Sequence, residues 1–266
     1  MSAPLPGLLA VWAAFALLVA ALARCRRSRR VDPEVLRKGL HAGMGLASLA
    51  LPCLFDTVWP VLGLALGFAL ALAARAWCPP VRRILGPILD DVGRPTVGAP
   101  LFPVAVAVTY AGAGGDRMIF AIPILILALA DTAAALVGRR LGRSRYGGPH
   151  GKSLEGSAAF LASALGCTAL PLGLGSDLAP VSIALISLCV ALLATLAEGL
   201  SRRGLDNLTV PLTALLLLRT LPPLTIWHLS LVLAGAGALT LASAWIGVRG
   251  ATRRGRPIGR SEPCRA

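Results

Sequence analysis

The most regular feature of the chain is a series of apolar runs separated by short polar segments. A window of roughly 20 residues, the length of helix that crosses a hydrocarbon core, finds nine such runs. They cover residues 8–23, 39–55, 58–74, 98–114, 118–138, 154–175, 178–199, 208–224 and 226–248. The runs are continuous and rich in leucine and alanine, not alternating, so they predict helices and not barrel strands. We expect an all-α, polytopic integral membrane bundle of about nine transmembrane helices.

Composition supports this class. Of the 266 residues, 56% are hydrophobic and only 14% are charged, which excludes an ordinary soluble domain. No internal repeat and no soluble domain is recognised. We therefore expect a single transmembrane domain over residues 1–248 and a disordered basic cytoplasmic tail over residues 249–266.

The cations predict the orientation. Of 26 lysines and arginines, 24 fall in alternate polar segments on one face of the expected bundle, and only Arg117 and Arg219 fall on the other. The positive-inside rule then places the N-terminus outside and the C-terminus in the cytoplasm. The arginine and alanine bias suits a bacterial protein, so we expect the inner (cytoplasmic) membrane, with any site on the cation-rich face open to the cytoplasm.

The net charge of +14 indicates what the chain binds. Its cations are spread over several short loops with few aromatic residues between them, a pattern that does not favour nucleic-acid binding. Anionic membrane lipids and a polyanionic substrate are the expected partners.

Lysine is rare in this chain. Only Lys38 and Lys152 occur beside 24 arginines, and both lie in short polar clusters at the mouth of an apolar run. A chain so biased towards arginine uses lysine where a compact, rotatable ammonium is needed instead of a planar fork. Phosphate binding is one such need.

Asp131 is the most unusual ionisable residue because it lies within an apolar run. Carboxylates at such depth are by default functional-site candidates. Asp131, Ala135, Gly138 and Gly142 share one helix face that is almost without side chains. This face predicts either a carboxylate beside a wet cavity or a small-residue seam for helix packing.

The segment YGGPHGKS, residues 146–153, has glycines and a lysine but is one residue short of the Walker A spacing and lacks a preceding strand. Ser153 is a candidate N-cap for the helix that follows, whose free amides favour an anion. Glu155, in its first turn, suits the helix dipole or a metal. The alternative is a well-capped structural loop.

Two further polar clusters flank apolar runs. RKGLH supplies Arg37 and His41 beside a lysine, and the cations there could also be simple topology anchors. Glu198 ends one run, where a helix pair with Arg202 is the alternative role. Asp206 and Asn207, in the loop that follows, are the next polar candidates in the chain.

All of these groups map to the cytoplasmic third of the expected bundle, where carboxylates able to hold Mg²⁺ would meet cations and helix N-termini able to hold phosphates. They are Arg37, Lys38, His41, Asp131, Arg139, Lys152, Glu155, Glu198 and Asp206. This inventory favours phosphoryl or nucleotidyl transfer at a membrane surface.

Four motifs, in this order, resemble the polyprenol kinase family, which includes phytol kinase and dolichol kinase. They are RKGLH, LADTAAALVGRRLGR, GKSLEGS and EGLSRRGLDNLTVP. The resemblance covers about residues 37–221, the expected catalytic core, and its most specific part is residues 131–157. Ala130 departs from the pattern, where the family's glycine is expected.

The resemblance implies an integral membrane kinase that passes the γ-phosphate of CTP, with a divalent metal such as Mg²⁺, to a long isoprenoid alcohol. It implies a nucleotide site made of Asp131, Gly138, Arg139, Gly142, Lys152, Ser153, Glu155, Gly156 and Ser157, completed by Glu198, Asp206 and Asn207.

We expect Asp131, Glu155, Glu198 and Asp206 as metal ligands, and Asp131, Glu198, His41 and Lys152 as catalytic groups. Arg37 and Lys38 are expected to join the nucleotide site and to contact a phosphate there. One alternative is a cytidylyltransferase resembling CDP-diacylglycerol synthase, although its further carboxylate-rich signature near the C-terminus is not found. The other is a membrane transporter or scaffold.

Overall fold

A computed structural model describes residues 4–27, 31–89, 97–146 and 151–254 of the chain. Within these ranges the chain is almost entirely helical. In order, the elements are α1 (Leu5–Arg27), α2 (Pro33–Ser48), α3 (Leu51–Leu54), α4 (Val58–Ala74), α5 (Pro79–Leu89), α6 (Gly98–Ala113), α7 (Arg117–Leu125), η1 (Ile126–Ala130), α8 (Asp131–Arg140), β1 (Arg145–Tyr146), β2 (Lys152–Ser153), α9 (Leu154–Gly175), α10 (Pro180–Leu200), α11 (Asp206–Thr220) and α12 (Ile226–Arg254).

The prediction of an all-helical bundle is confirmed, since each of the nine apolar runs forms helix. Three details differ from the prediction. The run 39–55 divides into α2 and α3, the short helix α5 was not expected, and a two-residue antiparallel hairpin, β1–β2, precedes α9. The run 118–138 is a composite of α7, the π-helix η1 and α8.

Five helical segments of the described ranges are long and apolar enough to cross a membrane. They are α1, the composite α7–η1–α8, α9, α10 and α12. A sixth is formed if α4 and the start of α5, which meet at a bend of 95°, count as one broken span. The helix α6 is apolar but shorter. Five or six capable spans support a membrane bundle, while the number nine stays a prediction.

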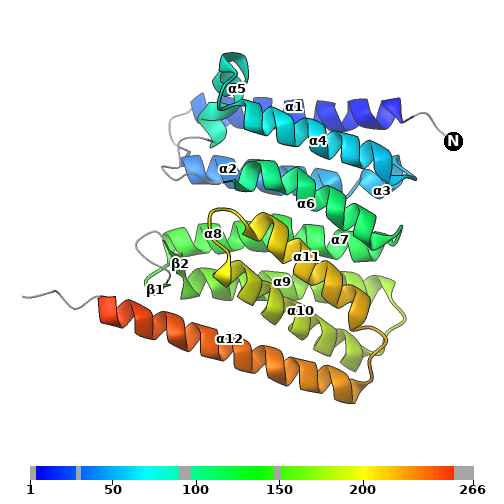
Figure 1. Ribbon diagram of the computed structural model, residues 1–266, viewed down its shortest axis with the longest axis vertical. Helices are drawn as coiled ribbons and strands as arrows, with labels where there is room; N and C mark the ends of the chain where they lie inside the picture. Colours follow the sequence, from blue (N-terminus) through cyan, green and yellow to red (C-terminus); the bar gives the residue numbers. More distant parts are fainter. Residues whose placement is uncertain (1–3, 28–30, 90–96, 147–150, 255–266) are drawn as a thin grey trace, which may run out of the picture.

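The helices lie side by side in a stack (Figure 1). The composite α7–η1–α8 runs through its middle, with α2 and α6 packed on one side and α9 on the other. The helices α1 and α4 lie towards one end of the stack, and α12 covers α10 at the other end. The core is mainly apolar, with Phe120, Ile126 and Phe160 among its fully buried side chains.

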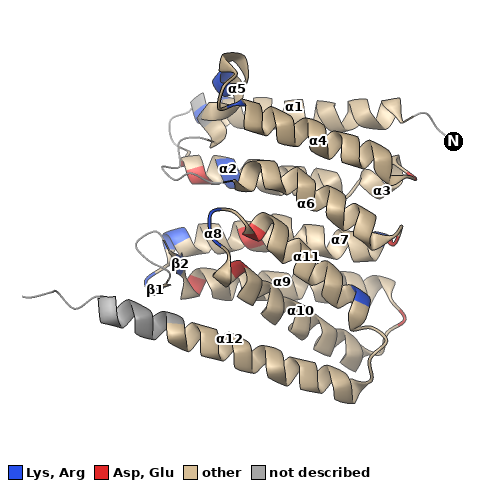
Figure 2. Cartoon of the chain, viewed as in Figure 1, with Lys and Arg blue, Asp and Glu red and all other residues tan. Residues whose placement is uncertain are grey.

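Most lysine and arginine positions gather at one end of the helices (Figure 2). The start of α2, the end of α8 and the β1–β2 hairpin lie at this end. Arg117, at the start of α7, and Arg219, in the last turn of α11, lie at the opposite end. The segregation expected from the sequence is therefore found among the described residues.

The helix α12 continues to Arg254, six residues into the segment expected to be a tail. The rest of that segment, residues 255–266, lies outside the described residues, as does the centre of the predicted glycine-rich loop, residues 147–150.

Candidate functional site

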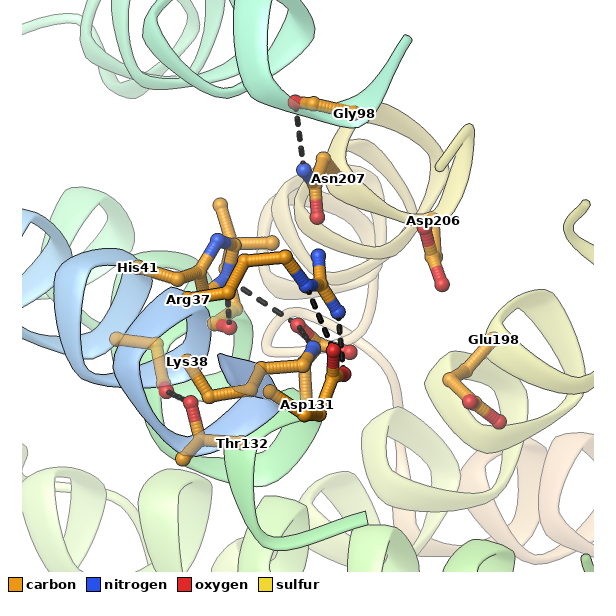
Figure 3. Close-up of polar contacts among 12 residues, drawn as sticks. Arg37, Lys38, His41, Gly98, Asp131, Thr132, Glu198, Asp206 and Asn207 are labelled. Atoms are coloured by element: carbon orange, nitrogen blue, oxygen red, sulfur yellow. Dashed lines mark hydrogen bonds and ion pairs between the residues drawn. The ribbon is translucent and has the colours of Figure 1, made fainter. Parts of the chain in front are cut away.

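The centre of the site is a buried ion pair between Lys38 of α2 and Asp131 of α8 (Figure 3). Lys38 Nζ lies 2.5 Å from Asp131 Oδ2, and the two residues are only 5% and 6% exposed. A charge at such depth is costly unless it is paired, so each group neutralises the other. The rare lysine and the intramembrane carboxylate, 93 residues apart in sequence, form one unit.

His41 completes this unit. It lies one turn after Lys38 on α2, and its Nε2 is 3.3 Å from Asp131 Oδ2 and 2.9 Å from the carbonyl oxygen of Leu127. Because a carbonyl oxygen can only accept, Nε2 carries a proton. The single Nε2–H therefore points to the Leu127 carbonyl and lies within reach of the Asp131 carboxylate as well.

The π-helix η1 makes this arrangement possible. The N–H of Asp131 donates to the carbonyl of Ile126, five residues back, instead of to that of Leu127. The Leu127 carbonyl can then accept from His41. Single π-turns within α-helices often mark functional sites. The residue pattern did not predict this one.

A glycine lets α2 approach the π-helix. A Cβ atom built on Gly45 would lie 2.5 Å from the Cβ of Ala128 in η1. The two backbones therefore meet closely one turn beyond His41, which sets the distance from α2 to Asp131.

Arg37 is held on α2 itself. Its guanidinium makes two hydrogen bonds to Glu34, with Nη2 to Oε1 at 2.6 Å and Nε to Oε2 at 2.9 Å. Glu34 is buried and was not identified as a site residue from the sequence. Asp32 accepts from the N–H of Glu34 as the N-cap of α2, and Pro33 opens the helix, so the start of α2 is well defined.

Lys152 is the centre of a second cluster. It projects from β2, opposite Tyr146 in the hairpin, and its Nζ lies 2.6 Å from Glu198 Oε1 and 3.0 Å from Asp206 Oδ2. It also donates to the main-chain carbonyl of Glu198. The alternative role of Glu198 as a simple helix-surface partner of Arg202 is therefore replaced by a buried contact between three elements.

The charge state of Lys152 follows from this environment. Burial alone would lower its pKa, but the attraction of Glu198 and Asp206 outweighs it, so the pKa lies above the ordinary lysine value. The Lys152 side chain is thus an ammonium at neutral pH, set between two carboxylates.

The start of α11 places Asp206. Arg203 and Gly204 adopt left-handed backbone conformations, with φ of 55° and 88°, and turn the chain from α10 into α11. Asn207 then donates from Nδ2 to the carbonyl oxygen of Gly98 at 2.7 Å, which fastens α11 to the start of α6. Asn207 is buried, and in the described structure this contact is structural; its predicted role at the nucleotide stays a prediction.

The two clusters face one another. Figure 3 shows Glu198 and Asp206 together on one side of the Lys38–Asp131 pair, and Asp131 interacts electrostatically with both Lys152 and Glu198. The expected convergence of helix ends is thus found for Lys38, His41 and Asp131 with Lys152, Glu198 and Asp206.

The predicted glycines form a helix contact between α8 and α9. A Cβ on Gly138 would lie 2.9 Å from Ser153 Oγ, one on Gly142 would lie 2.7 Å from the same atom, and one on Gly156 would lie 2.8 Å from the carbonyl of Ala134. Ser153 caps α9 by accepting from the N–H of Gly156 at 3.1 Å. These contacts fit the small-residue seam that the sequence left open, and nucleotide binding by these residues stays a prediction.

Three predicted residues make contacts beyond the two clusters. Glu155 accepts from the N–H of Ser144, at 3.2 Å to Oε1, and Arg139 pairs with Asp32 at 2.6 Å. Ser157 shares a hydrogen bond of 2.6 Å with the hydroxyl of Tyr146. Their roles at a metal or a triphosphate stay predictions.

Carboxylate oxygens are the atoms available for a divalent cation. No group of three or more His, Cys, Asp or Glu side chains poised to ligate a metal is found in the described part of the chain. However, Glu198 Oε2 is buried without a hydrogen-bond partner there. Because Mg²⁺ is commonly held by one or two carboxylates with substrate phosphates and water, the pair Glu198 and Asp206 fits such an ion.

Comparison with known proteins adds one finding. No family model and no solved structure matches the chain. Among curated proteins, it is similar to phytol kinase of Synechocystis sp., with 33% identity over 187 residues that cover 69% of this chain and 78% of that protein.

Proposed function

Since the chain belongs to the polyprenol kinase family that includes phytol kinase, and is thus a kinase that phosphorylates an isoprenoid alcohol, we propose that it transfers the γ-phosphate of a nucleoside triphosphate, CTP, to the hydroxyl of phytol or a related polyprenol. The observation that carries this proposal is the pair of facing clusters, one on Asp131 and one on Lys152.

The clusters divide the task. Phosphoryl transfer asks the protein mainly for positioning and for neutralisation of charge. Lys152 supplies a compact cation at the mouth of α9, where it would meet the β- and γ-phosphates. The group of Asp131, Lys38 and His41 would receive the alcohol, because a carboxylate beside two N–H donors can accept a proton while the donors hold the alcohol oxygen or a phosphate oxygen.

The reaction balances as follows. The alcohol oxygen forms a bond to the γ-phosphorus while the bond from that phosphorus to the bridging β-oxygen breaks, which leaves a nucleoside diphosphate. The hydroxyl proton passes to the Asp131 carboxylate, a general base within reach of the acceptor oxygen. Lys38 offsets the negative charge of Asp131 before transfer, and once Asp131 is protonated and neutral the Lys38 ammonium would pair with an oxygen of the transferred phosphoryl group.

A divalent cation, Mg²⁺, fits the second cluster, where Glu198 and Asp206 would hold it, and Asp131 extends the carboxylate set. When bound, it would neutralise charge on the transferred phosphoryl group. Lys152 would rearrange to make room, because its ammonium occupies the position between the two carboxylates.

We also propose that all nine apolar segments cross or enter the membrane, with the N-terminus outside and the cation-rich end in the cytoplasm. The shorter helices α2, α6 and α11 pack against longer ones. This orientation delivers cytoplasmic CTP to the two clusters, in a bacterial inner membrane.

The test is transfer of label. Purified protein in detergent or vesicles is incubated with phytol and CTP labelled at the γ- or at the α-phosphate. Label in the lipid from the γ position supports the kinase, whereas label from the α position identifies a cytidylyltransferase and overturns the proposal. A panel of CTP, UTP and ATP with phytol, farnesol and a dolichol then defines the donor and the acceptor.

A further inference from the structure

An apolar cavity of about 430 Å³ lies between α1, α2, α3, α4 and α6. Its wall is made almost wholly of hydrocarbon and aromatic side chains, among them Phe15, Met44, Phe68 and Val106. The one hydroxyl of its deeper part, that of Ser48, is already satisfied, since it donates to the Met44 carbonyl at 2.8 Å. The volume falls within the range of small-molecule pockets, roughly 300–1,000 Å³.

The cavity is polar at one end only. The polar and charged lining residues Arg37, His41, Arg75 and Asn207 come from the end next to the site, where α4 finishes, and Leu51 and Leu54 line the far end. His41 belongs both to this wall and to the Asp131 cluster, because its Nε2 lies 3.3 Å from Asp131 Oδ2. A molecule that fills the cavity therefore places one terminus beside the proposed base and the rest among apolar groups.

The helices give its depth. Arg37 and Ser48 both line the cavity and lie eleven residues apart on α2, or about 16 Å at the rise of an α-helix. An extended hydrocarbon advances roughly 1.3 Å per carbon for bonds near 1.5 Å, so this depth takes about a dozen carbons, or about three isoprene units. Leu51 and Leu54 of α3 lie beyond and extend the cavity towards a fourth unit.

We propose that this cavity binds the isoprenoid tail of the acceptor alcohol, with its hydroxyl at His41 and Asp131, and that its depth limits chain length. The inference rests on the proposed kinase function and adds the acceptor subsite. An amphiphile with a single polar head and a long apolar tail matches the one-sided polarity of the wall, whereas the triphosphate of a nucleotide does not.

The proposal is tested by shortening the cavity. Ala65 of α4 is buried and lines the middle of the wall, so Ala65→Phe fills the deeper half. Gly63→Phe on the same helix is the matched control, because a Cβ atom built there has no atom within 4 Å. Ala47→Leu blocks the same region from α2 if Ala65→Phe does not fold.

We expect Ala65→Phe to lower kcat/KM for phytol at least tenfold more than for geraniol, whose two isoprene units span roughly 10 Å at the same rise per carbon. Gly63→Phe should change both values less than twofold. An equal loss for the two alcohols, or no loss for either, overturns the assignment of the cavity.

A binding measurement separates this inference from the proposed function. Phytol that carries a diazirine near its terminal methyl groups is photolysed with the wild-type protein, and labelled peptides are mapped. Label on α3 and the start of α4, competed by unlabelled phytol and reduced in Ala65→Phe, supports the cavity even if no phosphoryl transfer is detected. Label confined to lipid-facing helix surfaces, or label that phytol does not displace because a membrane acyl chain occupies the cavity, overturns it.

Discussion

The Lys38 ammonium and the Asp131 carboxylate form a buried ion pair at 2.5 Å across the α2–α8 interface. Lys38 belongs to the RKGLH motif, which by itself indicates only a topology anchor, and Asp131 lies within a hydrophobic segment. Their contact gives each residue a specific role. A carboxylate at this depth requires a cation, and the compact ammonium of lysine supplies it without the bulk of a guanidinium group.

Asp131→Asn should abolish transfer while the protein remains folded. The amide keeps the shape of the side chain but cannot accept the hydroxyl proton, so we expect kcat to fall by about 10²–10⁴-fold. The matched control is Asp116→Asn at the other end of the same helical segment, where Asp116 is the N-cap of α7. Asparagine caps as well as aspartate, so full activity is expected there. Retained activity in Asp131→Asn would refute the role of the carboxylate.

Lys38→Met should destabilise the protein by about 3–5 kcal/mol, because it leaves a buried carboxylate without its partner. The double variant Lys38→Met with Asp131→Asn removes both charges and should recover most of this loss, although it stays inactive. Denaturant unfolding in detergent micelles measures both quantities. If the two single losses simply add, the residues are not coupled in the way the distance indicates.

The Lys152 cluster predicts a flat pH response near neutrality. The pKa of Lys152 is raised by Glu198 and Asp206 against the effect of burial. The contribution of these ion pairs to stability is therefore complete below the ordinary lysine pKa and is lost only as pH rises through the raised one.

We consequently expect that Lys152→Gln raises the KM for CTP by the same factor at all values from about pH 6 to 9. Arg145, in the exposed strand of the same hairpin, supplies the control variant Arg145→Gln. An inflection of the Lys152 effect near neutral pH would contradict the predicted charge state.

The glycine contact between α8 and α9 predicts a stability effect. Gly156→Ala places a methyl group 2.8 Å from the Ala134 carbonyl, so we expect a loss of about 1–3 kcal/mol from overpacking. Gly166→Ala, further along α9, meets nothing within 4 Å and should be neutral or slightly stabilising. Thermal unfolding of the two variants in parallel measures the difference in stability. Equal stability would show that α8 and α9 separate easily to admit the methyl group.

The proposed orientation is tested with two cysteines. Cys25, near the cation-rich end of α1, and Cys53, in α3 at the opposite end, are both free and exposed. In single-cysteine variants, a membrane-impermeant maleimide should label Cys53 in intact cells and Cys25 only after permeabilisation. The reverse pattern would invert the topology.

The sequence by itself determined the helical class, because long apolar runs without alternation leave the backbone no other way to satisfy its polar groups in hydrocarbon. It also gave Lys38, Asp131, Lys152 and Glu198 as candidates, since rare lysines and intramembrane carboxylates are unusual enough to be recognised one at a time.

Only the tertiary structure decided how these residues are paired. Nothing local places Lys38 beside Asp131 or Lys152 between Glu198 and Asp206, because such contacts depend on how distant helices pack. The π-turn before Asp131 and the apolar cavity that ends at His41 were also not predictable from the local sequence. The π-turn and the cavity arise from backbone geometry and from the spacing between helices. The order of residues along one helix does not determine either of these.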